Sequence, residues 1–238
     1  MKLILTIILL TILGMSIWSG FKKGLIRGIA SILVIVISLF VSSFFADKVS
    51  GELVPALDPF VGGFIDSGTN TEEILNKLGY GGTDLSLTDI LTQDTSLRYD
   101  YAYEAIRSIG FTRGVSEDLA DDSVRYATGT GVSLTEAVIV VLSHSIAYIG
   151  CVTIAFIMML ILLTAVMDLI NLDFHLPNVA FADEVAGAAL GLVKGFLYCV
   201  LLCWLLGFLG LLIGKETCEK TPLVNFFLAF RFITQTLI

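Results

Sequence analysis

The chain has 238 residues, of which 56% are apolar and 15% are charged, and its mean hydropathy is +0.90. Soluble domains are about 45–50% apolar and about 25% charged, so this composition indicates a membrane protein and excludes a disordered chain. Fourteen Lys and Arg against 22 Asp and Glu give a net charge of −8, the wrong sign for a nucleic-acid partner.

Four apolar stretches are candidates for membrane-spanning helices, which need about 20 residues. They are Leu3–Ser19, Ile29–Ala46, Ala137–Met167 and Gly195–Ile213. The third would be about 46 Å long as one helix, so it must tilt or project beyond the lipid. The pattern predicts an all-α polytopic membrane protein with about four transmembrane helices, arranged as one hairpin in residues 1–46 and another in residues 137–221.

The first stretch has an alternative interpretation as a cleaved signal peptide. However, the segment Gly14–Gly20 lacks an Ala-x-Ala cleavage site, and a second hydrophobic stretch follows Lys22 and Lys23. We therefore expect a retained helix, with Trp18 at a membrane interface, where amphipathic rings are favoured.

Residues 47–136 form a polar insert between the two hairpins. Six basic and 16 acidic side chains give it a net charge of −10. Its pattern predicts a mostly helical insert, with short helices at Thr71–Leu78, Leu87–Thr92, Ser96–Ile109 and Ser116–Tyr126. Ser133-Leu-Thr-Glu136 is a capping box directly before an apolar run, so the third long helix should begin there.

The tail, residues 222–238, is apolar with one internal charge, Arg231. Four of its apolar side chains share one helical face, namely Phe226, Phe227, Phe230 and Ile233. At 17 residues the tail is barely long enough to span. We favour an interfacial helix over a fifth span.

The loop between the first two stretches carries the densest basic cluster, Lys22, Lys23 and Arg27. The positive-inside rule places such a loop in the cytoplasm. Both termini and the acidic insert are then expected to face outward.

Two segments repeat glycine at four-residue spacing, which aligns the glycines on one face of a helix. The first contains Gly20, Gly24 and Gly28, and the second contains Gly187, Gly191 and Gly195. In lipid, helices associate by close backbone approach over small residues. We expect the two ladders to cross closely, either within one chain or between chains. The alternative is that they let something pass or move.

Charged side chains accompany both ladders, and Arg27, Asp183 and Lys194 are candidates for charge pairing. One interpretation is interfacial snorkelling or ordinary charge at helix ends, where Asp183 suits the start of the fourth helix. The other is an ion pair, such as Arg27 with Asp183, that locks the helices together.

Nothing in the sequence forms a catalytic, cofactor or metal-binding motif. His144 lies between two serines, but no Gly-x-Ser-x-Gly or His-Glu-x-x-His pattern and no phosphate-binding glycine loop occurs. The four cysteines form no CxxC pair, so we interpret them as small core residues, with a metal or redox pair as the alternative. We expect no enzyme activity and no cofactor. An intramembrane enzyme using His144, Asp168 and Asp183 is a third hypothesis.

The order of these segments resembles the colicin V production protein (CvpA) family of bacterial inner-membrane proteins. The resemblance rests on Gly20-Phe-Lys-Lys-Gly-Leu-Ile-Arg27 between two helices, on Asp183-Glu-Val-Ala-Gly-Ala-Ala-Leu-Gly-Leu-Val-Lys-Gly195 before the fourth, and on Lys220-Thr-Pro222-Leu. It covers about residues 1–46 and 137–225. The matching positions are Gly24, Arg27, Asp183, Gly187, Gly191 and Gly195. The 90-residue acidic insert departs from compact members, which have a short loop there.

The resemblance implies a multi-pass protein of the bacterial inner (plasma) membrane, associated with production or export of a peptide toxin or with envelope functions. It implies no known catalytic activity. Our first hypothesis is a non-catalytic accessory or scaffold protein that contacts membrane lipid and a protein partner or a second copy of itself. Its acidic insert would bind a basic peptide or cations. The alternative is a small oligomeric channel or transporter, because Gly-interrupted helices with charged ends suit that role.

Overall fold

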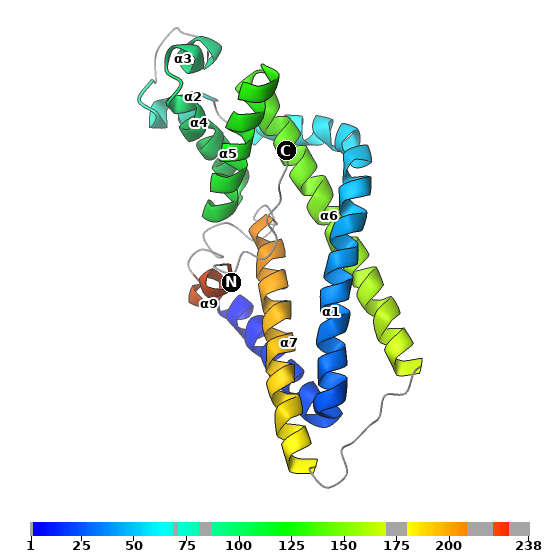
Figure 1. Cartoon of the computed structure of the whole chain (residues 1–238). Helices are drawn as coiled ribbons and strands as arrows, with labels where there is room; N and C mark the ends of the chain where they lie inside the picture. Colours follow the sequence, from blue (N-terminus) through cyan, green and yellow to red (C-terminus); the bar gives the residue numbers. More distant parts are fainter. Residues whose placement is uncertain (1, 69–70, 81–86, 170–179, 209–220, 229–238) are drawn as a thin grey trace. The chain divides into compact units, whose positions relative to one another are not determined.

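The computed structural model describes residues 2–68, 71–80, 87–169, 180–208 and 221–228, and within these ranges it contains helices and no strand. The helices are α1 (Lys2–Gly68), α2 (Thr71–Lys77), α3 (Leu87–Gln93), α4 (Leu97–Ile109), α5 (Arg113–Thr130), α6 (Leu134–Leu169), α7 (Ala180–Phe208) and α9 (Pro222–Leu228) (Figure 1). The all-α expectation is confirmed for this part of the chain.

The chain divides into two compact units. Unit 1 comprises Met1–Val49, Ile149–Leu205 and Lys220–Arg231, and unit 2 comprises Ser50–Tyr148, Leu206–Glu219 and Phe232–Ile238. Helices α1, α6 and α7 each contribute to both units, so among the described residues the boundaries fall inside continuous helices. The division predicted at residues 46, 136 and 221 stays a prediction.

Helix α1 is broken at Gly24, which has φ 72° and ψ −180°. This backbone conformation is open almost exclusively to glycine, and it separates an arm of residues 2–23 from an arm of residues 25–68. The first arm runs antiparallel to α7, because Gly20 lies beside Gly191 and Ser16 beside Gly195. In the second arm, Gly28 lies beside Leu190, so the chain turns back at Gly24 (Figure 1).

Three helical segments are long and apolar enough to cross a membrane. They are Leu3–Gly63, Leu134–Leu169 and Phe181–Phe208. Many large apolar side chains on them are exposed, including Trp18, Phe40, Ile157, Met158 and Phe181. Soluble proteins rarely expose so many together, so this surface indicates a membrane protein. Because the first segment includes both arms of α1, the predicted count of four transmembrane helices stays a prediction.

Helix α6 begins at the predicted capping box. The hydroxyl oxygen of Ser133 accepts a hydrogen bond from the Glu136 backbone N–H at 3.3 Å, which satisfies one of the unpaired amides at the helix start. The helix has 36 residues and is therefore about 54 Å long, well beyond the roughly 30 Å of a bilayer core. Its first turns supply Leu134, Val138 and Leu142 to the core of unit 2.

Helix α7 begins at Ala180, near Asp183, which the sequence had suggested for the start of the fourth helix, and the apolar stretch predicted from Gly195 lies within it. The glycine-rich segment before Gly195 is therefore part of the helix. An acidic side chain, Asp183, lies in its first turn, where a helix favours negative charge. Residues 209–213, the end of the predicted span, lie outside the described residues.

Unit 2 is built around its own buried residues. Helices α2, α3, α4 and α5 lie at the four positions where short helices were expected, and α4 packs against α5. The core includes Tyr101, Ile106, Phe111 and Leu119. Phe111 also makes an edge-to-face contact with Phe208, with 6.3 Å between ring centroids. The polar part of the chain therefore has a core of its own.

Helix α9 is the described start of the tail. Val224 and Phe227 are buried, and the Phe227 ring lies 5.4 Å from the Phe196 ring of α7, measured between centroids. Phe230 and Ile233, which belong to the predicted interfacial face, lie outside the described residues. The interfacial helix of residues 222–238 therefore stays a prediction.

Candidate functional site

The first arm of α1 and α7 touch through their glycines. A Cβ atom built on Gly20 would lie 2.7 Å from the Cα atom of Gly191, and one on Gly187 would lie 2.9 Å from the Cα atom of Gly24. A Cβ on Gly195 would lie 2.8 Å from the Cβ of Ser16. Real Cβ atoms essentially never approach so closely. The two ladders therefore meet within a single chain, backbone against backbone.

Gly28 differs from Gly20, Gly187 and Gly191, which lie against backbone atoms. A Cβ there would lie 2.9 Å from the side-chain Cδ1 atom of Leu190. The atom in its way belongs to a side chain rather than to a backbone. A substitution at Gly28 is therefore easier to accommodate than one at Gly20.

Asp183 links α7 to the bend in α1. It is 4% exposed, and its Oδ1 atom accepts a hydrogen bond from the Leu25 backbone N–H at 2.9 Å. Leu25 is the first residue of the second arm, where backbone amides have no partner within their own helix. Asp183 thus caps that arm from a neighbouring helix. The positive N-terminal ends of two helices explain why a carboxylate is tolerated in this buried position.

Arg27 forms its ion pair with Asp168, the penultimate residue of α6, with 2.6 Å between Nη2 and Oδ1. The sequence had suggested Asp183 as its partner, but that carboxylate is directed to the Leu25 amide. The side chains of Arg27 and Asp168 are 24% and 59% exposed. A pair this accessible contributes about 1 kcal/mol or less.

A small cleft of about 40 Å³ lies between the second arm of α1, α6 and α7. Its polar lining consists of Lys23, Arg27, Ser31, Thr164, Asp168, Lys194 and Tyr198. The Lys194 ammonium lies 5.7 Å from the centre of the Tyr198 ring, a cation–π contact. Two of the charges singled out from the sequence, Arg27 and Lys194, therefore share one cleft, whereas Asp183 is not among the residues lining it.

Ser31 and Tyr198 were not selected from the sequence, and Asp168 was named there only for the enzyme hypothesis and not as a partner of Arg27. Asp168 had a detectable signal, because it is an acidic residue directly after a long apolar stretch. Ser31 and Tyr198 had none, since a serine or tyrosine within an apolar helix is common. Only the packing of three helices brings them beside the lysines.

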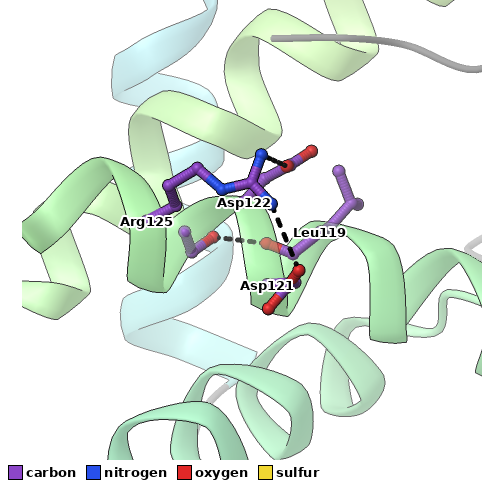
Figure 2. Close-up of polar contacts among 5 residues, drawn as sticks. Leu119, Asp121, Asp122 and Arg125 are labelled. Atoms are coloured by element: carbon purple, nitrogen blue, oxygen red, sulfur yellow. Dashed lines mark hydrogen bonds and ion pairs between the residues drawn. The ribbon is translucent and has the colours of Figure 1, made fainter. Parts of the chain in front are cut away.

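A second candidate surface lies on α5 in unit 2. Asp118 and Asp121 are exposed. Arg125 contacts Asp121 at 3.4 Å and Asp122 at 4.0 Å (Figure 2). Burial, and then the neighbouring carboxylates of Glu117 and Asp121, raise the pKa of Tyr99 in α4. The acidic side chains of α5 therefore extend to its contact with α4.

Asp122 makes unit 2 sensitive to pH. Burial raises the pKa of its carboxyl group, although Arg125 opposes the shift. Because the folded-state pKa lies above the unfolded value, the ionised group disfavours folding above the folded pKa, and this penalty disappears as the pH falls through it. We expect Asp122→Asn to raise the thermal unfolding midpoint at pH 7, and the gain to vanish near pH 3.5.

The matched control for this measurement is Asp121→Asn, which removes the exposed neighbour of the same arginine. It is expected to change the midpoint little at either pH, because exposed ion pairs contribute little. An Asp122→Asn gain of equal size at both pH values would contradict the proposed origin of the effect.

The residues of the enzyme hypothesis are divided between the units. His144 belongs to unit 2, whereas Asp168 and Asp183 belong to unit 1 and are engaged with Arg27 and Leu25. The second histidine, His175, lies outside the described residues. Among the described residues, no group of three His, Cys, Asp or Glu side chains is placed to hold a metal ion.

Comparison with known proteins gives one match. The chain matches the family described as "Colicin V production protein" over residues 5–76, which covers most of α1 and α2 and includes Gly20, Gly24 and Arg27. No curated protein and no solved structure matches it. Residues 5–76 are less than half of the chain, so the match shows a similarity of this part to the colicin V production protein (CvpA) family.

Proposed function

We propose that the chain is a non-catalytic membrane scaffold that presents unit 2 to a partner during production or export of a colicin V-type peptide, or in envelope maintenance. The similarity of residues 5–76 to the colicin V production protein family suggests a role in colicin V production. The finer role follows from the two units. Unit 1 has the exposed apolar surface and glycine contacts of a packed membrane bundle, and unit 2 has a separate core.

The observation that carries this proposal is the acidic surface on α5, next to the exposed Asp100 of α4. Asp100, Asp118 and Asp121 are exposed on helices whose opposite faces are buried in the core of unit 2. Along α5, four carboxylates accompany two arginines, Arg113 and Arg125. A folded surface with this excess of negative charge complements a basic peptide or the basic surface of a protein, and it speeds their encounter.

The charge at the bend supports the proposed orientation. Lys22, Lys23 and Arg27 flank Gly24, and short basic loops stay in the cytoplasm. Residues 25–46 of the second arm rise about 33 Å as a helix, enough to cross the bilayer core. The residues that follow, including the acidic helices, would then face outward from the plasma membrane.

The test is crosslinking and affinity capture of the full chain from native membranes. The variant Asp118→Lys with Asp121→Lys reverses the charge of the exposed surface and is expected to lose the partner. The control variant, Glu52→Gln with Asp89→Asn, neutralises exposed acidic residues on α1 and α3 and should keep it. Capture should also weaken as salt rises from 50 to 500 mM, because salt screens exposed charges.

Capture of the same partner by the charge-reversed variant would exclude the α5 surface as its docking site. Self-association alone, equal in both variants, would favour the oligomeric channel or transporter instead. Solute flux into liposomes that contain the verified, inserted chain is then the deciding measurement.

A further inference from the structure

The cleft in unit 1 collects more positive than negative charge. Lys23, Arg27 and Lys194 line it together with one carboxylate, Asp168. Asp168 is committed to Arg27 at 2.6 Å. Within the part of the chain that the structure describes, neither Lys23 nor Lys194 takes part in an ion pair. The cleft therefore keeps two ammonium groups in excess.

Two like charges in a partly buried cleft repel each other more strongly than they would in water. Lys194 is half-buried and comes from α7, whereas Lys23 is exposed and precedes the bend in α1. The fold therefore brings two separate cations to one place, next to a third. An anion between the lysines would turn this repulsion into attraction. The arrangement is thus suited to a negatively charged ligand.

The size and lining of the cleft identify the kind of anion. About 40 Å³ holds roughly three water molecules, which is the scale of a phosphate group and too small for a whole lipid. Val34 and Met167 line the same cleft, so apolar surface adjoins the cations. A phospholipid has this combination at the junction between its headgroup and its acyl chains. Basic pockets between membrane helices are suited to such headgroups.

We propose that this cleft binds the phosphate of an anionic phospholipid, with Lys23 and Lys194 as the principal contacts. Free inorganic phosphate shares the same chemistry, and the apolar lining favours the lipid. The site lies in unit 1 and involves none of the acidic residues of α5. The test of this lipid site is therefore independent of the test of the partner surface proposed above.

The test uses the full chain purified in detergent. Short-chain phosphatidylglycerol is titrated while the thermal unfolding midpoint is followed, with phosphatidylcholine of the same chain length as the neutral lipid and inorganic phosphate as the free anion. A ligand that binds only the folded chain raises the midpoint with its concentration. We expect a saturable rise with phosphatidylglycerol and none with the other two.

The variants separate the cleft from general surface charge. Each near-surface cation contributes about 1 kcal/mol to anionic-lipid binding. Lys23→Gln and Lys194→Gln should therefore each weaken the affinity for phosphatidylglycerol about fivefold. Lys194→Arg keeps the charge and should retain binding. The control is Lys22→Gln, because Lys22 does not line the cleft and lies 5.1 Å from the centre of the Trp18 ring. Its affinity should equal that of the unmodified chain.

Several results would overturn the proposal. One is an equal rise with phosphatidylcholine, which would indicate a general effect of lipid. Another is a loss of affinity for phosphatidylglycerol in Lys22→Gln that is as large as the loss in Lys194→Gln. Such a loss would indicate binding by diffuse surface charge. A rise with inorganic phosphate that equals the rise with phosphatidylglycerol would assign the cleft to a free anion instead of a lipid.

Discussion

The variant Gly191→Ala is expected to lower the thermal unfolding midpoint of the chain in detergent by roughly 2–12 °C. The added Cβ would lie 3.0 Å from the Cα of Gly20 and 3.1 Å from the Cα of Ile17, and closer still to the Ser16 carbonyl oxygen. Because backbone atoms are in the way, α1 and α7 must separate. Forcing extra atoms into a packed interface costs about 1–3 kcal/mol, and each kcal/mol lowers the midpoint of a chain of this size by about 2–4 °C.

The matched control is Gly14→Ala in the first arm of the same crossing. No atom lies within 4 Å of a Cβ built there. Alanine favours a helix over glycine by about 1 kcal/mol, so this variant should raise the midpoint slightly. The two substitutions are chemically identical and have opposite expected signs. A stabilising effect of Gly191→Ala would show that α1 and α7 do not cross at their glycines.

The variant Asp183→Ala is expected to destabilise the first turn of the second arm of α1. It removes the carboxylate that accepts the Leu25 N–H. Losing a cap costs about 0.5–2 kcal/mol, and leaving a buried amide unpaired costs about 1–3 kcal/mol. The specific measurement is hydrogen exchange of the Leu25 amide, which should accelerate at least tenfold.

Asp183→Asn separates the hydrogen bond from the charge. Its side-chain oxygen still accepts the bond, while the favourable interaction of a negative charge with two helix ends is lost. We expect Leu25 to stay protected and the unfolding midpoint to fall less than in Asp183→Ala. Glu184→Ala is the neighbouring control. Unchanged Leu25 exchange in Asp183→Ala would contradict the proposed role of Asp183.

Several features of the fold could be predicted from local patterns. Long apolar runs, the spacing of short helices in the polar insert and the capping box at Ser133 each depend on residues close in sequence. The position of Asp183 at the start of the fourth helix also depends on local sequence, because a helix favours negative charge in its first turn. Helix α7 begins at Ala180, with Asp183 in its first turn.

The site was less predictable, because its parts lie far apart in the sequence. Charge alone cannot distinguish Asp168 from Asp183 as the partner of Arg27, since both flank long apolar helices. The structure distinguishes them because the helix after Gly24 begins with an unpaired amide, and the buried Asp183 satisfies it.

The sequence by itself determined that the chain is helical and apolar enough for a membrane, that its negative charge lies in one polar segment, and that two glycine ladders and a basic bend accompany the long helices. These properties depend on composition and on the helical period, which are local. Only the tertiary structure decided that the ladders meet each other within one chain, that Asp183 caps the arm beginning at Leu25, and that Lys23 and Lys194 share a cleft. Those facts depend on how helices cross, and the direction of a crossing is set by contacts between residues more than 100 positions apart.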